Sequence, residues 1–361
     1  MRPGNRIARW LRRPWGVAAQ SRHVSRDPID HVILLDGTLG SLRPGDETHV
    51  GRTYKLLREL PGKAPVSLYY EPGIQWQDWR STGDVAAGRG INRQIRRAYG
   101  YLSSRYRPGD RIFLIGYSRG AYAVRSLAGV ISNVGLLRAS HATERNVRQA
   151  YRHYEAAGDS TARAAFTTAY CHAHVEIEMI GVWDTVKALG LRLPVLWMVT
   201  EARHEFHDHR LGPVVRNAFQ ALAFDERRVA FMPVLWDAPA PRAGRVEQTW
   251  FRGCHGDVGG QLGGFDAALP LAHIPLVWML DRIERCGLDL PGGWRLRFPC
   301  DAEAPSVGMN RGWGKLFLLR RPREACCGPC ESLHPSARLS PRYGSLAGEV
   351  AVAPPALTPQ E

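Results

Sequence analysis

The sequence predicts an α/β protein built on a mainly parallel, doubly wound β-sheet with helices on both of its faces. Short apolar, β-branched runs recur along the chain, and segments with apolar residues at helical spacing lie between several of them. Such runs are typical of parallel strands that are buried on both faces. Strands that alternate with helices favour this type of sheet. A chain of 361 residues, 44% of them hydrophobic and 23% charged, is long enough to bury its core.

The first half of the chain supplies three strands and two helices. Residues 31–35 form an apolar run that ends in an Asp-Gly-Thr turn, and residues 66–70 and 111–116 form two further runs. Residues 92–106 place apolar and aromatic side chains at helical spacing until a Pro-Gly-Asp turn ends the pattern. Residues 121–131 continue as a helix with several small residues, which suits close packing against the sheet.

The second half of the chain continues the alternation. Residues 175–183 begin with alternating apolar residues and end as a continuous apolar run, which predicts a strand. Residues 229–236 and 246–253 are also expected to form strands, whereas residues 214–224 and 271–286 are expected to form helices. These elements complete a sheet of the predicted kind.

A Gly-x-Ser-x-Gly pentapeptide at residues 116–120 lies between a buried strand and the small-residue helix. In such a turn the serine adopts a strained backbone conformation, and larger residues two positions away would collide with neighbouring chain. The strand before it and the helix after it favour this nucleophile elbow over an ordinary tight turn. The sequence therefore predicts that Ser118 is the nucleophile of a serine hydrolase with an α/β-hydrolase-like fold.

A serine hydroxyl needs a base and an acid that orients the base, which follow it here in the order Ser, Asp or Glu, His. His255 follows the last predicted strand in a glycine-rich loop that can direct it towards Ser118. Asp184 ends a buried strand, where a carboxylate needs a partner such as an imidazole N–H. Asp184 is the expected acid, with Asp225 and Asp257 as alternatives. Asp257 is close in sequence to His255 and is expected to support its loop.

Ester cleavage through a serine also needs two backbone N–H donors for the oxyanion. One is expected from Arg119, the residue after the nucleophile, and the other from the loop after the first strand, at Gly37 or Thr38. Asp36 is expected to support that loop, and a plain strand-to-loop turn is the alternative interpretation. The chemistry requires no metal and no organic cofactor.

Three other motifs carry weaker signals. Residues 204–209 hold three histidines, of which two would share a helix face, so a solvated loop is expected rather than a metal site. Residues 326–330 contain a Cys-Gly-Pro-Cys run outside any βαβ context, which makes redox or metal chemistry a minor alternative there. Residues 189–199 are apolar and interrupted by Pro194, which suits either a lid beside the acid or a buried helix.

The formal net charge of +14 comes almost wholly from arginine. It predicts attraction to anionic surfaces, including peripheral contact with an anionic membrane. No nucleic-acid partner is expected, because the sequence carries no recognisable nucleic-acid-binding motif. The longest apolar runs are far shorter than the roughly 20 residues that cross a bilayer. With no secretory signal peptide in view and seven cysteines that cannot all pair, we expect a cytoplasmic location, and export by a dedicated secretion system stays open.

Composition divides the chain into three parts. Residues 1–28 hold seven arginines and no acidic residue before Asp27, which predicts a disordered basic arm, with a transit peptide as the alternative. Residues 29–303 hold the predicted strands and helices and form the catalytic domain. Residues 304–361 are rich in Arg, Pro and Cys and are expected to form a C-terminal appendage and tail. The sequence does not predict an oligomeric state.

Several ordered blocks of this sequence resemble the α/β-hydrolase domain of the class-one type VI secretion lipase effectors and of related uncharacterised bacterial and fungal proteins. One departure is that Leu39 and Gly40 follow the Asp-Gly-Thr turn, where the family usually carries an aromatic residue or Gly followed by Asn. The resemblance implies triad roles for Ser118, Asp184 and His255 and hydrolysis of phospholipid or other lipid esters. The matching blocks are residues 35–38, 69–73, 109–110, 116–122, 181–186, 223–228 and 250–260.

We therefore expect a serine hydrolase that cleaves carboxylic esters, with lipid or phospholipid acyl esters as the favoured substrates, through a Ser-Asp-His triad and an acyl-enzyme. Two alternatives remain. The first is an esterase or thioesterase that acts on a soluble substrate, and the second is a non-catalytic binding protein on the same fold.

Overall fold

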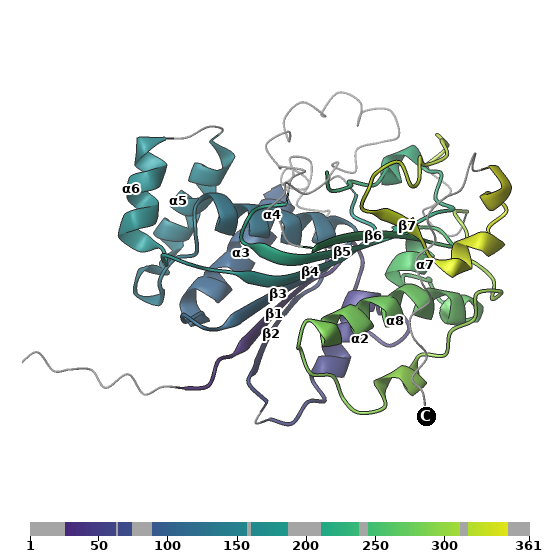
Figure 1. The fold of residues 1–361 in the computed structure, drawn as a ribbon, viewed down its shortest axis with the longest axis horizontal. Helices are drawn as coiled ribbons and strands as arrows, with labels where there is room; N and C mark the ends of the chain where they lie inside the picture. The colour runs from purple at the N-terminus through teal and green to yellow at the C-terminus, as the bar shows by residue number, and fades with distance from the viewer. Residues whose placement is uncertain are drawn as a thin grey trace, which may run out of the picture.

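All strands of the described chain run parallel in one sheet (Figure 1). The computed structural model describes residues 26–62, 64–73, 89–156, 160–186, 211–237, 245–310 and 317–345. Across this part of the chain the sheet has seven strands in the order β2-β1-β3-β4-β5-β6-β7. This arrangement confirms the predicted fold class. The strands are β1 (Asp30–Leu35), β2 (Val66–Glu71), β3 (Arg111–Tyr117), β4 (Ile177–Trp183), β5 (Val215–Ala223), β6 (Arg245–Phe251) and β7 (Glu331–Leu333).

Helices cover both faces of the sheet (Figure 1). Helices α3, α4 and α5 pack on one face, and α2 and α8 pack on the other. Short 3₁₀ turns, such as Val229–Phe231, connect several elements. The α-helices are α2 (His49–Leu57), α3 (Arg89–Arg105), α4 (Arg119–Asn133), α5 (Glu144–Glu155), α6 (Thr161–Tyr170), α7 (His255–Gly259) and α8 (Leu269–Arg285).

Side chains of the central strands alternate between two separate hydrophobic cores. In β1, Ile33 and Leu35 point into the core with α3 and α4, whereas Val32 and Leu34 point into the core with α2 and α8. Because successive side chains of a strand point to opposite faces, a strand covered on both faces must be apolar at nearly every position. This explains the continuous apolar runs of the sequence.

Two predicted elements are wrong. Residues 214–224, predicted as a helix, form strand β5, which pairs with β4 on one side and β6 on the other. An apolar run buried on both faces has no period that separates a strand from a buried helix. Residues 229–236, predicted as a strand, form a 3₁₀ turn and then an irregular segment with one isolated bridge at Pro233. Proline has no N–H to donate to a ladder.

The order of the strands creates a switch point next to β1. The chain passes from β1 to β2 on one side and then crosses to β3 on the other side of β1. In open parallel sheets such a switch point opens a crevice at the carboxyl ends of the strands, where ligands bind. The residues that follow β1, β3 and β4 therefore lie close together at the carboxyl ends of these neighbouring strands.

The C-terminal segment that we expected to form an appendage contributes to the sheet. Glu331, in β7, pairs with Gln248 of β6, and its carboxylate accepts a hydrogen bond of 2.8 Å from the indole N–H of Trp250. At the other end of the described chain, Arg26 forms an ion pair of 2.6 Å with Asp110. The three domain boundaries stay predictions, but the sheet extends beyond residue 303.

The second glycine of the pentapeptide at residues 116–120 offers a test of the packing between α4 and β1. A Cβ atom at Gly120 would lie 2.1 Å from the carbonyl oxygen of Leu35. We expect Gly120→Ala to lower the free energy of unfolding by at least about 2 kcal/mol, because backbone must move to relieve the overlap. Denaturant unfolding measures this change. Gly292→Ala is the control, since nothing lies within 4 Å of its added methyl group; equal stability of the two variants would contradict the packing described.

Candidate active site

The chain turns sharply at Ser118, between β3 and α4. Ser118 has φ 55° and ψ −119°, a strained conformation for a residue with a side chain. Its N–H donates to the carbonyl of Trp183 at 3.0 Å, which ties the turn to the end of β4. A Cβ atom at Gly116 would lie 2.7 Å from the carbonyl oxygen of Gly120. Glycine is therefore required at position 116, as it is at position 120, and both requirements are those of the predicted nucleophile elbow.

Three buried side chains from different elements form a hydrogen-bonded chain at this turn. The Nε2 atom of His255 lies 2.9 Å from the Oγ atom of Ser118. The Nδ1 atom of the same ring lies 2.5 Å from the Oδ2 atom of Asp184. All three side chains are buried. The structure thus brings together the predicted nucleophile, base and acid in the order that serine activation requires.

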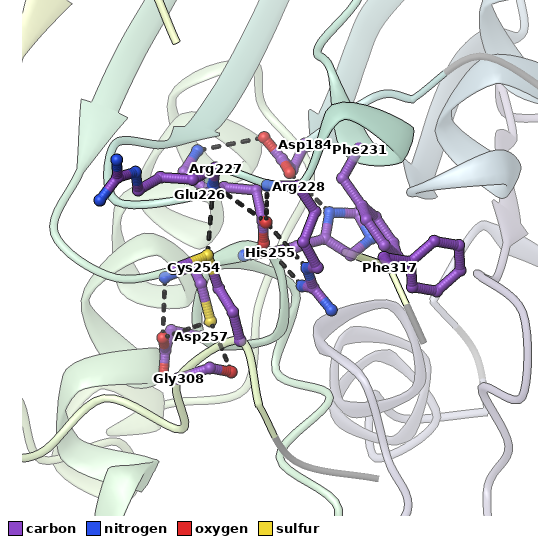
Figure 2. A network of polar contacts seen from close by, with 12 residues as sticks. Asp184, Glu226, Arg227, Arg228, Phe231, Cys254, His255, Asp257, Gly308 and Phe317 are labelled. Atoms are coloured by element: carbon purple, nitrogen blue, oxygen red, sulfur yellow. Dashed lines mark hydrogen bonds and ion pairs between the residues drawn. The ribbon is translucent and has the colours of Figure 1, made fainter. Parts of the chain in front are cut away.

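The imidazole of His255 is held from several sides (Figure 2). His255 is the first residue of α7, and its N–H donates to the Oε2 atom of Glu226 at 3.1 Å. Its ring packs against the rings of Tyr117 and Phe231, with centroid distances of 4.8 Å and 4.7 Å. Phe231 in turn packs against Phe317. These contacts fix the direction in which Nε2 points.

Glu226 is a site residue that we did not single out from the sequence, although it lies in one of the blocks that carry the family resemblance. It is buried and forms a two-point ion pair with Arg228, at 2.6 Å and 2.8 Å. Burial by itself raises the pKa of this carboxyl, but Arg228 outweighs burial and holds the pKa at about 2. Glu226 is therefore ionised and can hold the backbone of His255 over a wide pH range.

Asp184 takes an unusual backbone conformation directly after β4. Its φ is 41°, and its N–H donates to the carbonyl of Ala221 at 2.8 Å. The N–H of Ala223 donates to its Oδ1 atom, and the guanidinium of Arg323 donates to both oxygens, at 2.6 Å and 3.0 Å. Burial alone would raise the pKa of Asp184, but the charge of Arg323 and the bond to His255 lower it well below its usual value. Arg323 is the second site residue that we missed.

The two alternative acids support the loop of His255 instead of contacting its ring. The carboxylate of Asp225 accepts the N–H of Gly253 at 2.6 Å. The carboxylate of Asp257 accepts the N–H groups of Cys254 and Val307, at 2.8 Å and 2.7 Å (Figure 2). The geometry of Asp257 is that of the predicted loop support, and Asp184 is the carboxylate that faces the imidazole.

The loop after β1 lies against the serine turn. Asp36 is buried, and its carboxylate accepts bonds from the N–H of Gly37 at 2.7 Å, the hydroxyl of Thr48 at 2.7 Å and the phenol of Tyr70 at 2.8 Å. A Cβ atom at Gly40 would lie 2.4 Å from this carboxyl group. Glycine at position 40 therefore leaves room for the carboxylate that organises the loop.

The predicted oxyanion donors differ in their availability. Gly37 already donates its N–H to Asp36, in contrast to our expectation of a free donor. Thr38 accepts a bond from Gln261 through its carbonyl, and within the described chain its N–H has no hydrogen-bond partner. The N–H of Arg119, at the first position of α4, has no acceptor inside the helix. Arg119 and Thr38 are thus the better placed pair.

The guanidinium of Arg119 is a partly buried cation beside the serine turn. It makes no hydrogen bond or ion pair with any residue of the described ranges. Burial lowers its pKa to about 10, so it stays protonated at neutral pH. A partly buried cation without a counter-charge is costly, and it lies one residue from the predicted nucleophile.

Two other predicted features lie outside the described residues: the apolar segment 189–199 and the histidine cluster 204–209. Cys326, Cys327 and Cys330 are free cysteines. Among the described residues, no group of three or more His, Cys, Asp or Glu side chains is arranged to hold a metal ion. No helix in the same residues is long and apolar enough to cross a membrane.

Comparison with known families places most of the described sheet in one of them. Residues 30–282 match the sequence model of a family described as the catalytic domain of Tle1-like phospholipase effectors of the type VI secretion system. The chain belongs to this Tle1-like family. The match covers β1 to β6 and therefore includes Ser118, Asp184 and His255, whereas Arg323 lies beyond it.

Individual relatives are distant and longer. The uncharacterized protein YEL023C of Saccharomyces cerevisiae is 27% identical over 226 residues, which cover 55% of this chain and 31% of the yeast protein. A crystal structure of an uncharacterized protein from Pseudomonas aeruginosa is 16% identical, with a TM-score of 0.42 over 80% of this chain and 52% of that one. The Tle1 effector bound to the VgrG spike of the type 6 secretion system is also 16% identical, with a TM-score of 0.37 over 65% and 52% of the two chains.

The carboxyl group of Asp36 provides a pH test of the loop. Burial raises its pKa from 3.8 to about 6, although its hydrogen bonds favour the ionised form. A raised pKa means that the folded state loses stability relative to the unfolded state as the pH rises through about 6. Between pH 4 and pH 7, we expect the stability of the protein to fall relative to Asp36→Asn by about 2 kcal/mol.

Denaturant unfolding at a series of pH values measures this difference. Asp46→Asn, an exposed change in the same loop, is the control and should follow the wild-type profile. Parallel profiles for Asp36→Asn and the wild-type protein would contradict a raised pKa at position 36.

Proposed function

We propose that this protein is a serine hydrolase that cleaves the acyl esters of phospholipids or other lipids through Ser118, His255 and Asp184. The observation that carries this proposal is the pair of hydrogen bonds that joins the three side chains, at 2.9 Å and 2.5 Å. Such a chain makes a serine hydroxyl nucleophilic, because the imidazole can take its proton while the carboxylate holds the imidazole.

The reaction begins when Nε2 of His255 accepts the proton of the Ser118 hydroxyl as Oγ attacks the ester carbonyl. Asp184 accepts the bond from Nδ1–H and stabilises the imidazolium. The N–H groups of Arg119 and Thr38 donate to the oxyanion of the tetrahedral intermediate. The C–O bond to the alcohol then breaks, and the imidazolium gives its proton to the leaving oxygen. Water, deprotonated by His255, hydrolyses the acyl-enzyme by the same steps.

Features beside the catalytic residues support a lipid substrate. Phe317 packs against Phe231 at 5.2 Å, and Phe231 packs against His255. The next two residues, Leu318 and Leu319, are 78% and 55% exposed. Exposed apolar side chains in a row suit contact with a lipid surface. The apolar segment 317–319 therefore supports a lipid-binding surface beside the proposed site, as does the phospholipase description of the family.

Among the described residues the guanidinium of Arg119 has no ion-pair partner, which supports an anionic group in the substrate near the scissile ester. A phosphate of a phospholipid would supply the counter-charge that this cation lacks in the described chain. Together with the net charge of +14, it favours an anionic lipid over a neutral soluble ester as the substrate.

Loss of the serine hydroxyl tests the reaction type. We expect Ser118→Ala to lower kcat on a short-chain carboxylic ester by at least about 10⁴-fold, because no other group can form the acyl-enzyme. Hydrolysis of a chromogenic ester and of phosphatidylglycerol vesicles measures the loss. Ser104→Ala, a change at an exposed serine, is the control. Activity of Ser118→Ala equal to that of the control would sink the proposal.

Replacement of the exposed leucines tests the lipid surface. We expect the double change Leu318→Ser and Leu319→Ser to lower hydrolysis of anionic vesicles at least about tenfold, because two apolar side chains no longer leave water. Hydrolysis of a soluble short-chain ester should stay within about twofold of wild type.

The matched control for this double change is Leu296→Ser. Leu296 is 90% exposed and lies away from segment 317–319, on the 3₁₀ turn Trp294–Arg297, whose Arg297 pairs with Glu59. An equal loss on vesicles for Leu296→Ser, or an equal loss on both substrates for the double variant, would rule out a specific lipid-binding role for segment 317–319.

A further inference from the structure

The predicted triad acid has a second partner that lies outside the family match. Arg323 donates through both terminal nitrogens to the two oxygens of Asp184, at 2.6 Å and 3.0 Å. Its side chain is buried, with 2% of the residue exposed. The planar guanidinium fork matches a carboxylate in two-point geometry, which restrains both the position and the rotation of the carboxyl group.

The backbone around the site holds this guanidinium in place. Arg323 also donates to the carbonyl of Ala223 at 2.8 Å and to the carbonyl of Phe231. Its own carbonyl accepts a bond of 2.8 Å from Arg342, and the N–H of Arg321 donates to the carbonyl of Arg227 at 2.7 Å. The segment is thus tied to the chain that follows β5 by the backbone of Arg321 and by the guanidinium of Arg323 itself, so the fork is set before substrate binds.

Arg323 supplies the positive charge that offsets the carboxylate of Asp184. Glu226 and Arg228 neutralise each other in their ion pair. Burial raises the pKa of the Tyr117 and Cys254 side chains, so both are uncharged at neutral pH. Tyr117, Glu226 and Arg323 contact the pair directly. The further titratable groups behind them are Asp36, Arg228, Cys254 and Asp257.

Removal of Arg323 would leave the negative charge of Asp184 directed at the imidazole alone. A carboxylate whose charge is shared with a guanidinium attracts a proton on the neighbouring ring less strongly. In the wild-type protein the two oxygens of Asp184 are instead shared between the imidazole and the guanidinium of Arg323.

We propose that Arg323 is a positioning residue for the triad, which fixes the carboxylate of Asp184 by its fork and tunes the basicity of His255 by its charge. This inference rests on the proposed serine hydrolase function. It also implies that the catalytic unit extends beyond the family match at residues 30–282 and needs the C-terminal segment that carries Arg323 and β7.

Two substitutions in the full chain separate the fork from the charge. Arg323→Gln removes both, and Arg323→Lys keeps the charge but cannot bond both oxygens in the same plane. The profile of kcat/KM against pH on a soluble ester reports the ionisation of the free enzyme. For Arg323→Gln we expect a lower kcat and an acid limb that moves to higher pH by about one unit. For Arg323→Lys we expect a kcat about tenfold lower with the limb unmoved.

The control is Arg321→Gln, since Arg321 is exposed, lies on the same segment and pairs only with Glu324 among the described side chains. It should leave both kcat and the acid limb unchanged. Thermal unfolding shows which variants are folded. A folded Arg323→Gln with an unmoved acid limb would overturn the tuning role. If Arg323→Gln does not fold, Arg323→Lys alone tests the positioning role. A wild-type kcat for Arg323→Lys would overturn that role.

Failure of this inference is distinguishable from failure of the proposed function. Full activity of Ser118→Ala would contradict the proposed triad itself. If Ser118→Ala is inactive and both Arg323 variants behave like the wild-type protein, the proposed triad stands and only the positioning role of Arg323 is rejected.

Discussion

A buried carboxylate organises this site. Asp184 is fully buried and ionised, which is tolerable only where hydrogen bonds and opposite charge replace water. The groups that satisfy it come from three places in the chain: His255 at the start of α7, the N–H of Ala223 at the end of β5, and Arg323 in the C-terminal segment. The need to satisfy one charge thus brings the loops at the carboxyl edge of the sheet into a single arrangement.

The parallel sheet explains how these groups meet. Strands β1, β3 and β4 end side by side, so the loop with Asp36, the turn at Ser118 and the carboxylate of Asp184 lie at one edge. Two of these residues, Ser118 and Asp184, adopt positive φ angles of 55° and 41°. Strain of this kind persists only where the surrounding structure holds it, and it gathers at functional sites. The ion pair of Glu226 and Arg228 supplies part of that support by holding the backbone of His255.

Much of the site could be predicted from local sequence patterns. The predicted nucleophile, Ser118, lies in a short motif, and Asp184 and His255 each follow a strand that its apolar residues reveal. Strand β5 was mistaken for a helix because burial on both faces removes the alternation that marks a strand. Arg323 could not be predicted in this way, because it lies 139 residues from Asp184 and only the fold brings the two together. The three residues of β7 are likewise too few to show a period. The bond from Gly37 to Asp36 depends on a turn conformation that composition does not specify.

A covalent probe can show directly whether Ser118 is an activated nucleophile. A fluorophosphonate reacts with a serine only where a base can take its proton and an oxyanion site can hold the developing charge. We predict that intact-mass and peptide analysis of the treated chain will find one adduct, on Ser118, and that His255→Ala will abolish it. An unlabelled chain, or labelling of Ser118 that does not change in His255→Ala, would contradict the proposed role of Ser118.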